Sequence, residues 1–213
     1  MNNSTNRAFT LIELLVVIAM IAVLASLAYA GAGAMIGKGH ATKCLSNMRQ
    51  IGAAMQMFVG DNDGRLPSVQ HKGQVSWTNS LGAFLGTNFI GRCPALQHYP
   101  DAVGVTYGWS DMLTETNKSS AWQGLRIARI ARPSSTIVVA EKQMSSGNFD
   151  HFHFREALGS RGRISMPKFE KQVNTKAHGN RANYLFVDGH VETLAADEVK
   201  ARLETANPAF LVP

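Results

Sequence analysis

The chain has 213 residues, 45% of them hydrophobic, with a formal net charge of +6 and a sequence pI of about 9.5. A basic chain can bind nucleic acid, but here Lys and Arg are scattered, without a recognition-helix or aromatic RNA-binding pattern. We therefore expect no nucleic-acid partner, and the length suits one domain plus an anchor.

The N-terminal region contains an uncharged run of 23 residues, Leu14 to Ile36. As a helix it would be about 35 Å long, which exceeds the roughly 30 Å hydrocarbon core of a bilayer, so the run predicts a membrane-spanning helix. Glu13 directly precedes it. A carboxylate in the centre of a membrane helix costs roughly 2.5–3.5 kcal/mol. We therefore expect Glu13 to have a partner and a function.

One interpretation of this region is a secretory signal peptide. Arg7 would form its positive region and residues 14–25 its apolar core, and Ala28-Tyr29-Ala30 would be an A-x-A-like cleavage site before Gly31. The apolar run, however, continues past this site to Ile36.

A second interpretation is an uncleaved membrane anchor. Lys38, Lys43 and Arg49 follow the span, whereas Arg7 and the α-amine precede it. The positive-inside rule would then tend to leave the C-terminal head in the cytoplasm.

A third interpretation rests on the stretch AFTLIE, residues 8–13. It resembles the processing site of type IV prepilins and type II secretion pseudopilins, a short polar leader followed by Phe-Thr-Leu-Ile-Glu. The resemblance implies a leader at residues 1–8, cleavage between Ala8 and Phe9, and N-methylation of Phe9. Ala8 departs from the family, which usually has Gly there.

The resemblance also implies a function for Glu13. If the helix begins at Phe9, Phe9 and Glu13 are i and i+4 and share one face. Cleavage creates an amine on Phe9, at the positive end of the helix dipole. Glu13 would neutralise this amine, or that of a neighbouring subunit, and would thus determine assembly.

The resemblance further implies the partners, the location and the fold. The partners would be prepilin peptidase, other pilin-like subunits and an inner-membrane assembly platform. The chain would be a single-pass protein of the bacterial inner membrane with a periplasmic head, a structural subunit of a pseudopilus or pilus and not an enzyme, with no cofactor. Its fold would be α+β and pilin-like, with a long N-terminal helix packed on a small antiparallel sheet.

The helix is predicted to continue beyond the membrane. Residues 9–37 form the transmembrane and assembly segment, and apolar residues at spacings of three and four make residues 38–64 its amphipathic continuation. We predict one helix from Phe9 to Gly60, weakened at its glycines and ended by the turn Asp61-Asn62-Asp63-Gly64.

Residues 65–213 are predicted to form the head, with short strands between loops. Residues 134–140 suit a buried strand. The Asp188-Gly189 pair between β-rich runs predicts a hairpin over residues 182–194. A two-residue turn would pair Val187 with His190 and Phe186 with Val191, and Gly189 would supply the positive φ.

His178 lies ten residues before Asp188, and this His-x9-Asp-Gly spacing resembles the C-terminal signature of one pseudopilin-like group. Two roles remain open. The signature is structural, or His178, Asp188 and His190 bind a structural metal ion, with His151 or His153 as a further ligand. The metal alternative corresponds to a metal-dependent envelope enzyme, and a secreted or membrane-anchored envelope binding protein is the other rival function.

The two cysteines, Cys44 and Cys93, show no zinc-binding spacing. If the head lies outside the cytoplasm, a disulfide between them becomes an option, but the sequence does not show whether their Cα atoms lie close enough.

Overall fold

The computed structural model describes residues 9–69, 76–86, 91–96, 104–115, 122–143, 150–159, 162–205 and 210–211. The leader predicted at residues 1–8, with Ala8, lies outside the described residues. The chain divides into two compact units, Met1–Gly39 and His40–Pro213, and each is described by itself.

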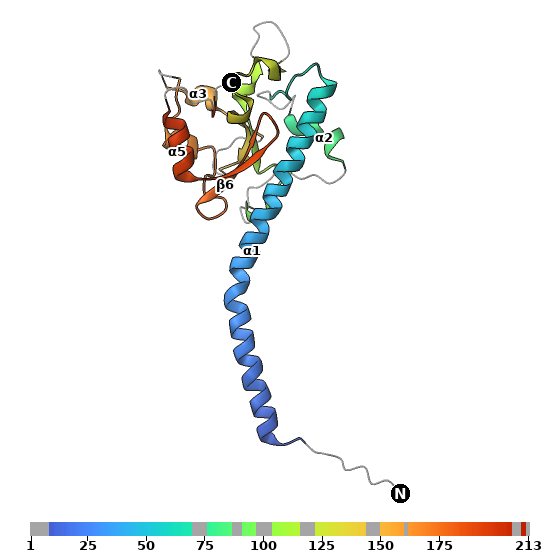
Figure 1. The fold of residues 1–213 in the computed structure, drawn as a ribbon, viewed down its shortest axis with the longest axis vertical. Coiled ribbons are helices and arrows are strands. Elements are labelled where there is room, and N and C mark those ends of the chain that lie inside the picture. The colour runs from blue at the N-terminus through green and yellow to red at the C-terminus, as the bar shows by residue number, and fades with distance from the viewer. Residues whose placement is uncertain are drawn as a thin grey trace. The chain divides into compact units, whose positions relative to one another are not determined.

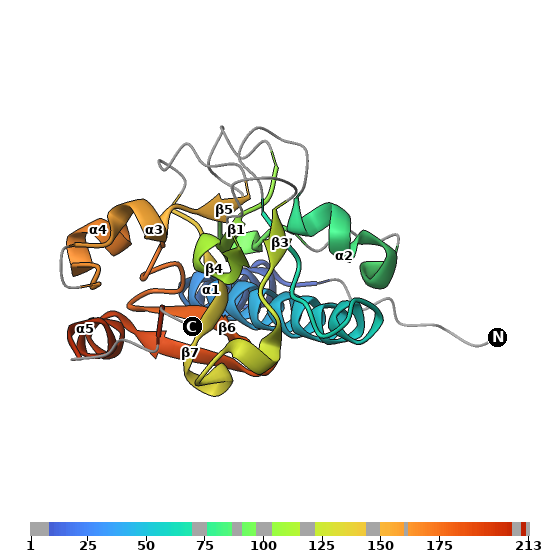
Figure 2. The same cartoon turned by 90° about the horizontal axis from the view of Figure 1, so that it is seen from above.

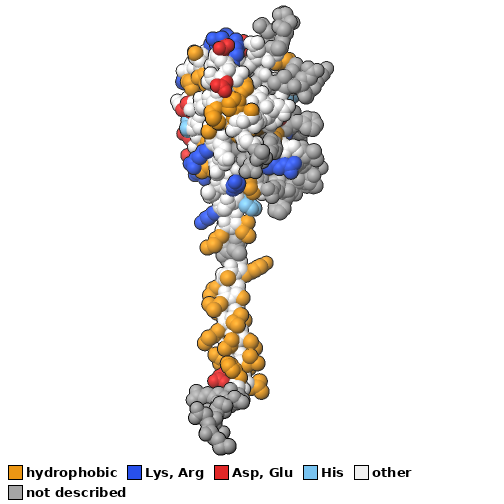
Figure 3. All heavy atoms as spheres, turned by 90° about the vertical axis from the view of Figure 1, so that its right-hand side faces the viewer, with side chains coloured by type: hydrophobic (Ala, Val, Ile, Leu, Met, Phe, Trp, Pro, Cys, Tyr) orange, Lys and Arg blue, Asp and Glu red, His pale blue; other side chains and the backbone are white. Residues whose placement is uncertain are grey.

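The first unit is dominated by the beginning of helix α1 (Leu11–Asp61), which is helical throughout its 51 residues. Large apolar side chains on this part of α1 are exposed, as the hydrophobic atoms in Figure 3 show. Leu11–Tyr29 has a mean hydropathy of 2.8 and is long and apolar enough to cross a membrane, judged by length and composition. The helix begins two residues later than predicted, because Thr10 caps it.

Helix α1 ends at the predicted turn. Asp63 and Gly64 have positive φ angles of 52° and 73°, and the Gly64 N–H donates to the Val59 carbonyl at 3.0 Å. This bond satisfies a carbonyl that the last helical turn would leave unpaired. The predicted stop is therefore confirmed.

The second unit contains a five-stranded sheet in the order β5-β1-β4-β6-β7. Its strands are β1 (Tyr107–Ser110), β4 (Ile137–Glu141), β5 (His151–Phe152), β6 (Arg181–Phe186) and β7 (Val191–Ala195). The β1–β5 pair is parallel and the other pairs are antiparallel. The short strands β2 (Thr114–Glu115) and β3 (Gln123–Gly124) form a separate antiparallel pair.

The remaining elements of this unit are short. The α-helices are α2 (Trp77–Leu85), α3 (Phe154–Ala157), α4 (Met166–Glu170) and α5 (Ala196–Glu204), and the 3-10 helices are η1 (Pro94–Leu96), η2 (Asp111–Leu113), η3 (Ile127–Arg129) and η4 (Pro133–Ser135). Figures 1 and 2 place α3 and α5 at one side of the head and α2 at the other.

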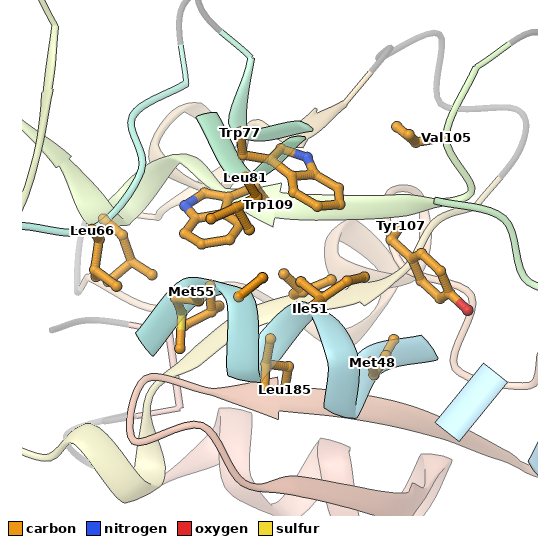
Figure 4. Close-up of a cluster of buried hydrophobic side chains, with 14 of the residues drawn as sticks. Met48, Ile51, Met55, Leu66, Trp77, Leu81, Val105, Tyr107, Trp109 and Leu185 are labelled. Atoms are coloured by element: carbon orange, nitrogen blue, oxygen red, sulfur yellow. The ribbon is translucent and has the colours of Figure 1, made fainter. Parts of the chain in front are cut away.

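The sheet separates two buried apolar clusters, because successive side chains of a strand point to opposite faces. On one face the C-terminal part of α1 contributes Met48, Ile51 and Met55, which lie among Trp77, Trp109, Tyr107 and other apolar residues in Figure 4. The aromatic rings of Trp77 and Trp109 stack at 5.7 Å between centroids. Trp122, by contrast, is only half-buried.

The opposite face packs against the C-terminal helices. Tyr184 and Phe186 of β6 belong to this second cluster, with Phe169 of α4, Val199 of α5 and Phe210. Leu185, between Tyr184 and Phe186, belongs instead to the cluster with α1. A helix followed by a mostly antiparallel sheet is the α+β, pilin-like fold that the resemblance predicted.

The predicted hairpin exists, but its predicted register is wrong by one residue. Leu185, and not Phe186, is opposite Val191, and the Phe186 N–H donates to the His190 carbonyl. The loop therefore has three residues, Val187-Asp188-Gly189, and Gly189 at φ 93° closes it. In this loop the Val187 carbonyl accepts a hydrogen bond from Gln56 Nε2 of α1, at 3.0 Å.

Candidate functional site

At the start of α1, Glu13 and Thr10 cap the helix reciprocally. Glu13 Oε2 accepts from the Thr10 N–H at 2.9 Å and from the Thr10 hydroxyl at 2.7 Å, and the Glu13 N–H donates to Thr10 Oγ1 at 3.3 Å. This is the capping-box arrangement, with Thr10 at the N-cap and Glu13 at the third helical position. The carboxylate thus has a partner three residues away in its own chain.

Phe9 precedes this cap and is 77% exposed. Because α1 begins at Leu11, Phe9 and Glu13 are not i and i+4 of one helix in the uncut chain. The predicted Phe9–Glu13 arrangement therefore requires a change at the helix start. Cleavage before Phe9 would produce an amine on the residue next to Thr10, whose N–H and hydroxyl already donate hydrogen bonds to Glu13.

The three residues of the alternative metal site do not come together. Asp188 Oδ1 contacts His190 Nδ1 at 2.5 Å in the hairpin loop, whereas His178 Nε2 contacts Glu141 Oε1 at 2.6 Å. His178 and Asp188 lie before and after β6, whose six residues span roughly 20 Å. The alternative in which His178, Asp188 and His190 bind one ion therefore has no support in this geometry, because an extended strand separates its members.

His151 and His153, the further ligands of that alternative, lie elsewhere in the head. His151 Nδ1 contacts Asp150 Oδ1 at 2.7 Å, and His153 Nδ1 contacts Glu156 Oε2 at 3.4 Å. Burial alone would raise the pKa of Asp150, but hydrogen bonds from His151 and Ser76, with nearby positive charge, hold it below its usual value. These contacts are consistent with a structural role for both histidines.

A buried polar cluster lies where the second half of α1 meets the sheet. Cys44 of α1 and Cys93, which precedes η1, form a disulfide with 4.9 Å between their Cα atoms, and both residues are fully buried. Cys93 Sγ lies 3.7 Å from His178 Nε2 and 4.0 Å from Glu141 Oε1. The disulfide, Glu141 and His178 therefore form one contact group.

Glu141, the last residue of β4, is the centre of this group and is fully buried. Its Oε2 accepts from the Asn183 N–H at 2.7 Å, and its Oε1 accepts from Asn183 Nδ2 at 3.0 Å. His178, whose side chain is 5% exposed, contacts the same Oε1. A buried carboxylate is tolerated when donors satisfy its oxygens, and here two residues do so.

The surroundings of the cluster keep it shielded from water. The Tyr107 hydroxyl donates to the Cys44 carbonyl at 3.5 Å, and Asn47 Nδ2 donates to the Arg92 carbonyl at 3.0 Å. Burial, followed by the negative charge of Glu141, raises the pKa of Tyr107, so Tyr107 remains a neutral hydrogen-bond donor. Among the described residues, His178 Nδ1 is buried without a hydrogen-bond partner.

Sequence reasoning named Cys44, Cys93 and His178 but missed Glu141. The residue ends a continuous apolar strand, Ile137–Glu141, in which all five residues are buried. A charged residue at the end of such a run is a signal that could have been noticed. Its partners, however, are 37 and 42 residues away, so only the fold reveals them.

Comparison with known proteins bears on the first unit. Residues 3–29 match the family described as "Prokaryotic N-terminal methylation motif". No curated protein and no solved structure matches the chain.

The N-terminal segment is thus a type IV pilin-like methylation motif. A pilin-like motif of this kind implies a prepilin-like protein that prepilin peptidase processes and that its apolar helix anchors in the inner membrane. It also implies a structural and non-enzymatic protein. The match ends at residue 29, so it does not include the head or the His-x9-Asp-Gly residues.

Proposed function

We propose that this chain is a structural pilin or pseudopilin subunit, cut between Ala8 and Phe9, N-methylated on Phe9 and assembled into a periplasmic pseudopilus or pilus. A type II protein secretion system is the machine in which we place it. The observation that carries the proposal is the methylation motif at residues 3–29, which includes the exposed apolar span Leu11–Tyr29.

The disulfide supports a head outside the cytoplasm. Structural disulfides persist in oxidising compartments such as the periplasm and are rare in the cytosol. The buried Cys44–Cys93 bond therefore argues against the cytoplasmic head that the charges after the span would favour. With its head in the periplasm, the chain assembles with other pilin-like subunits through the inner-membrane assembly platform.

Glu13 has two successive roles in this proposal. In the uncut chain it caps α1 through Thr10, so its carboxylate is hydrogen-bonded before processing. After cleavage the Phe9 amine adds a positive charge at the positive end of the helix dipole. Glu13 then pairs with this amine, or with that of a neighbouring subunit as helices stack, which makes burial of the carboxylate tolerable.

Mass spectrometry of the mature N-terminus tests the processing step. Expression beside a prepilin peptidase should give a chain that begins with N-methyl-Phe9. Ala8→Gly should be cut at least as completely, while the bulky Ala8→Leu should leave the precursor uncut. A mature chain that begins at Gly31 would identify a signal peptide and overturn the proposal, as would an uncut wild-type chain.

A Glu13→Gln variant tests the assembly step separately. Gln keeps the size and the hydrogen-bonding oxygen but removes the charge that the Phe9 amine needs. We expect cleavage as in the wild type but at least about tenfold less subunit in sheared filament fractions, which corresponds to a loss of about 1.4 kcal/mol per contact. Filament incorporation equal to the wild type would rule out the amine–carboxylate pairing.

A further inference from the structure

Four side chains with metal-binding atoms converge in the buried cluster of the head. Cys44 comes from α1, Cys93 from the segment before η1, Glu141 from the end of β4 and His178 from the turn before β6. One ligand atom from each lies within 4.8 Å of the other three, and the four side chains are buried or nearly so.

The donor set is two sulfurs, one imidazole nitrogen and one carboxylate oxygen. Four ligands of these types in a closed, buried position suit a tetrahedral Zn²⁺ site of the structural kind. Mg²⁺ and Ca²⁺ prefer oxygen ligands only, so the sulfurs favour zinc. The ligands come from four separate segments of the head, so the fold and not one local motif brings them together.

We propose that the head, with its cysteines reduced, binds one Zn²⁺ ion through Cys44 Sγ, Cys93 Sγ, His178 Nε2 and Glu141 Oε1. Binding displaces the two thiol protons to solvent, because the thiolate is the metal ligand. The newly made, reduced chain and the disulfide-bonded chain are then two alternative states of one site.

Conversion between the two states balances as a two-electron reaction. An oxidising protein disulfide accepts two electrons from the two thiolates and becomes a dithiol with two protons from solvent. The Cys44–Cys93 bond forms and the ion leaves, because disulfide sulfurs are poor zinc ligands. Zinc would thus hold the head folded before oxidation, and the disulfide would replace it afterwards.

Residues around the site would hold the Glu141 carboxylate in one orientation. Asn183 donates its N–H to Glu141 Oε2 at 2.7 Å, the oxygen that the proposal leaves free of metal. The Thr193 hydroxyl in turn donates to Asn183 Oδ1 at 2.7 Å. Hydrogen bonds from neighbouring residues to a metal ligand fix the direction of that ligand. The competing interpretation is that Glu141 and His178 form only a structural hydrogen bond beside a permanent disulfide.

Zinc and cobalt titration of the full chain in detergent distinguishes the two interpretations. The chain is reduced, freed of metal by a chelator and desalted without oxygen, beside an oxidised sample treated in the same way. We expect the reduced chain to bind one equivalent of Zn²⁺, and Co²⁺ in its place to show thiolate charge-transfer and tetrahedral d–d absorption. The oxidised chain should bind none. If the reduced chain takes up no zinc, folded or unfolded, the proposal is wrong.

Variants distinguish zinc bound at this four-ligand site from zinc bound by the cysteine thiols alone. His178→Gln should weaken zinc binding about 100-fold or more, since loss of a residue that only hydrogen-bonds to a ligand already costs roughly 10–100-fold. It should also change the cobalt d–d bands. His190→Gln is the matched control, because His190 directly follows the hairpin loop and contacts Asp188. Equal zinc affinity of His178→Gln and wild type would overturn the proposal.

The outcome is independent of the proposed function. The titration concerns residues of the unit His40–Pro213, whereas processing and assembly concern the motif at residues 3–29. A chain that is processed normally but binds no zinc would overturn only the metal site.

Discussion

Glu13 and Glu141 are two carboxylates in apolar parts of the chain, and they are accommodated in opposite ways. Glu13 lies at the start of an exposed apolar helix and accepts hydrogen bonds from Thr10, three residues away. Glu141 is fully buried and accepts from Asn183 and His178, 42 and 37 residues away. The hydrogen bonds of Glu13 depend on local chain geometry, and those of Glu141 depend on the fold of the whole head.

This difference indicates that Glu141 contributes to the stability of the head, whereas Glu13 contributes to assembly. Glu141 is fully buried and its hydrogen bonds join distant segments of the head, so its substitution should be measured as lost stability. Glu13 is capped by its own turn and can exchange that contact for an amine after cleavage. Its loss should be measured in assembly and not in the stability of the head.

The largest expected effect on the head is loss of the disulfide. Cys44 and Cys93 are 49 residues apart, and a closed loop of this length stabilises a protein by about 4 kcal/mol in the chain-entropy account. Cys44→Ser/Cys93→Ser should therefore lower the free energy of unfolding by about that amount. Denaturant unfolding of the full chain in detergent, followed by near-ultraviolet circular dichroism with chelator present, measures it.

Each single Cys→Ser variant is the control for this experiment. The singles should lose as much stability as the double, because either change abolishes the same bond. A loss below about 1 kcal/mol in the double would show that the disulfide contributes little to the head.

Glu141→Gln should have the next largest effect, a loss of about 2–3 kcal/mol. The Gln amide brings a donor to a position where Asn183 and His178 already donate, so a buried polar group loses its partner. Glu13→Gln is the matched control in the same unfolding experiment, and it should leave the transition of the head unchanged. Equal effects of the two substitutions would contradict the difference between the two carboxylates.

Gly189→Ala should have the smallest of the three effects, a loss of about 1–2 kcal/mol. Its φ of 93° is unfavourable for a side chain, and a Cβ there would lie 3.2 Å from Gln56 Nε2. Gly64→Ala is the control, because Gly64 has φ 73° but an added Cβ would meet nothing within 4 Å. Thermal unfolding measures both, and a Gly189→Ala loss no greater than that of Gly64→Ala would exclude a contribution from the α1 contact.

Part of the head could be predicted from sequence and part could not. Asp61–Gly64 ends α1 as predicted, because a turn depends on adjacent residues. The hairpin around Gly189 exists, but its loop is one residue longer than predicted. Two- and three-residue loops with Asp-Gly have similar sequence patterns, and here the Gln56 contact from α1 accompanies the longer one.

The sequence alone determined the N-terminal segment and its expected processing. Apolar composition, the AFTLIE stretch and the Thr10–Glu13 cap act over a few residues, so local chemistry defines them. Only the tertiary structure determined which residues His178 contacts. An extended strand separates it from Asp188, and the folding of β4 against β6 brings it to Glu141 instead. Contacts between distant segments depend on how the whole core packs, and spacing in the chain does not encode that packing.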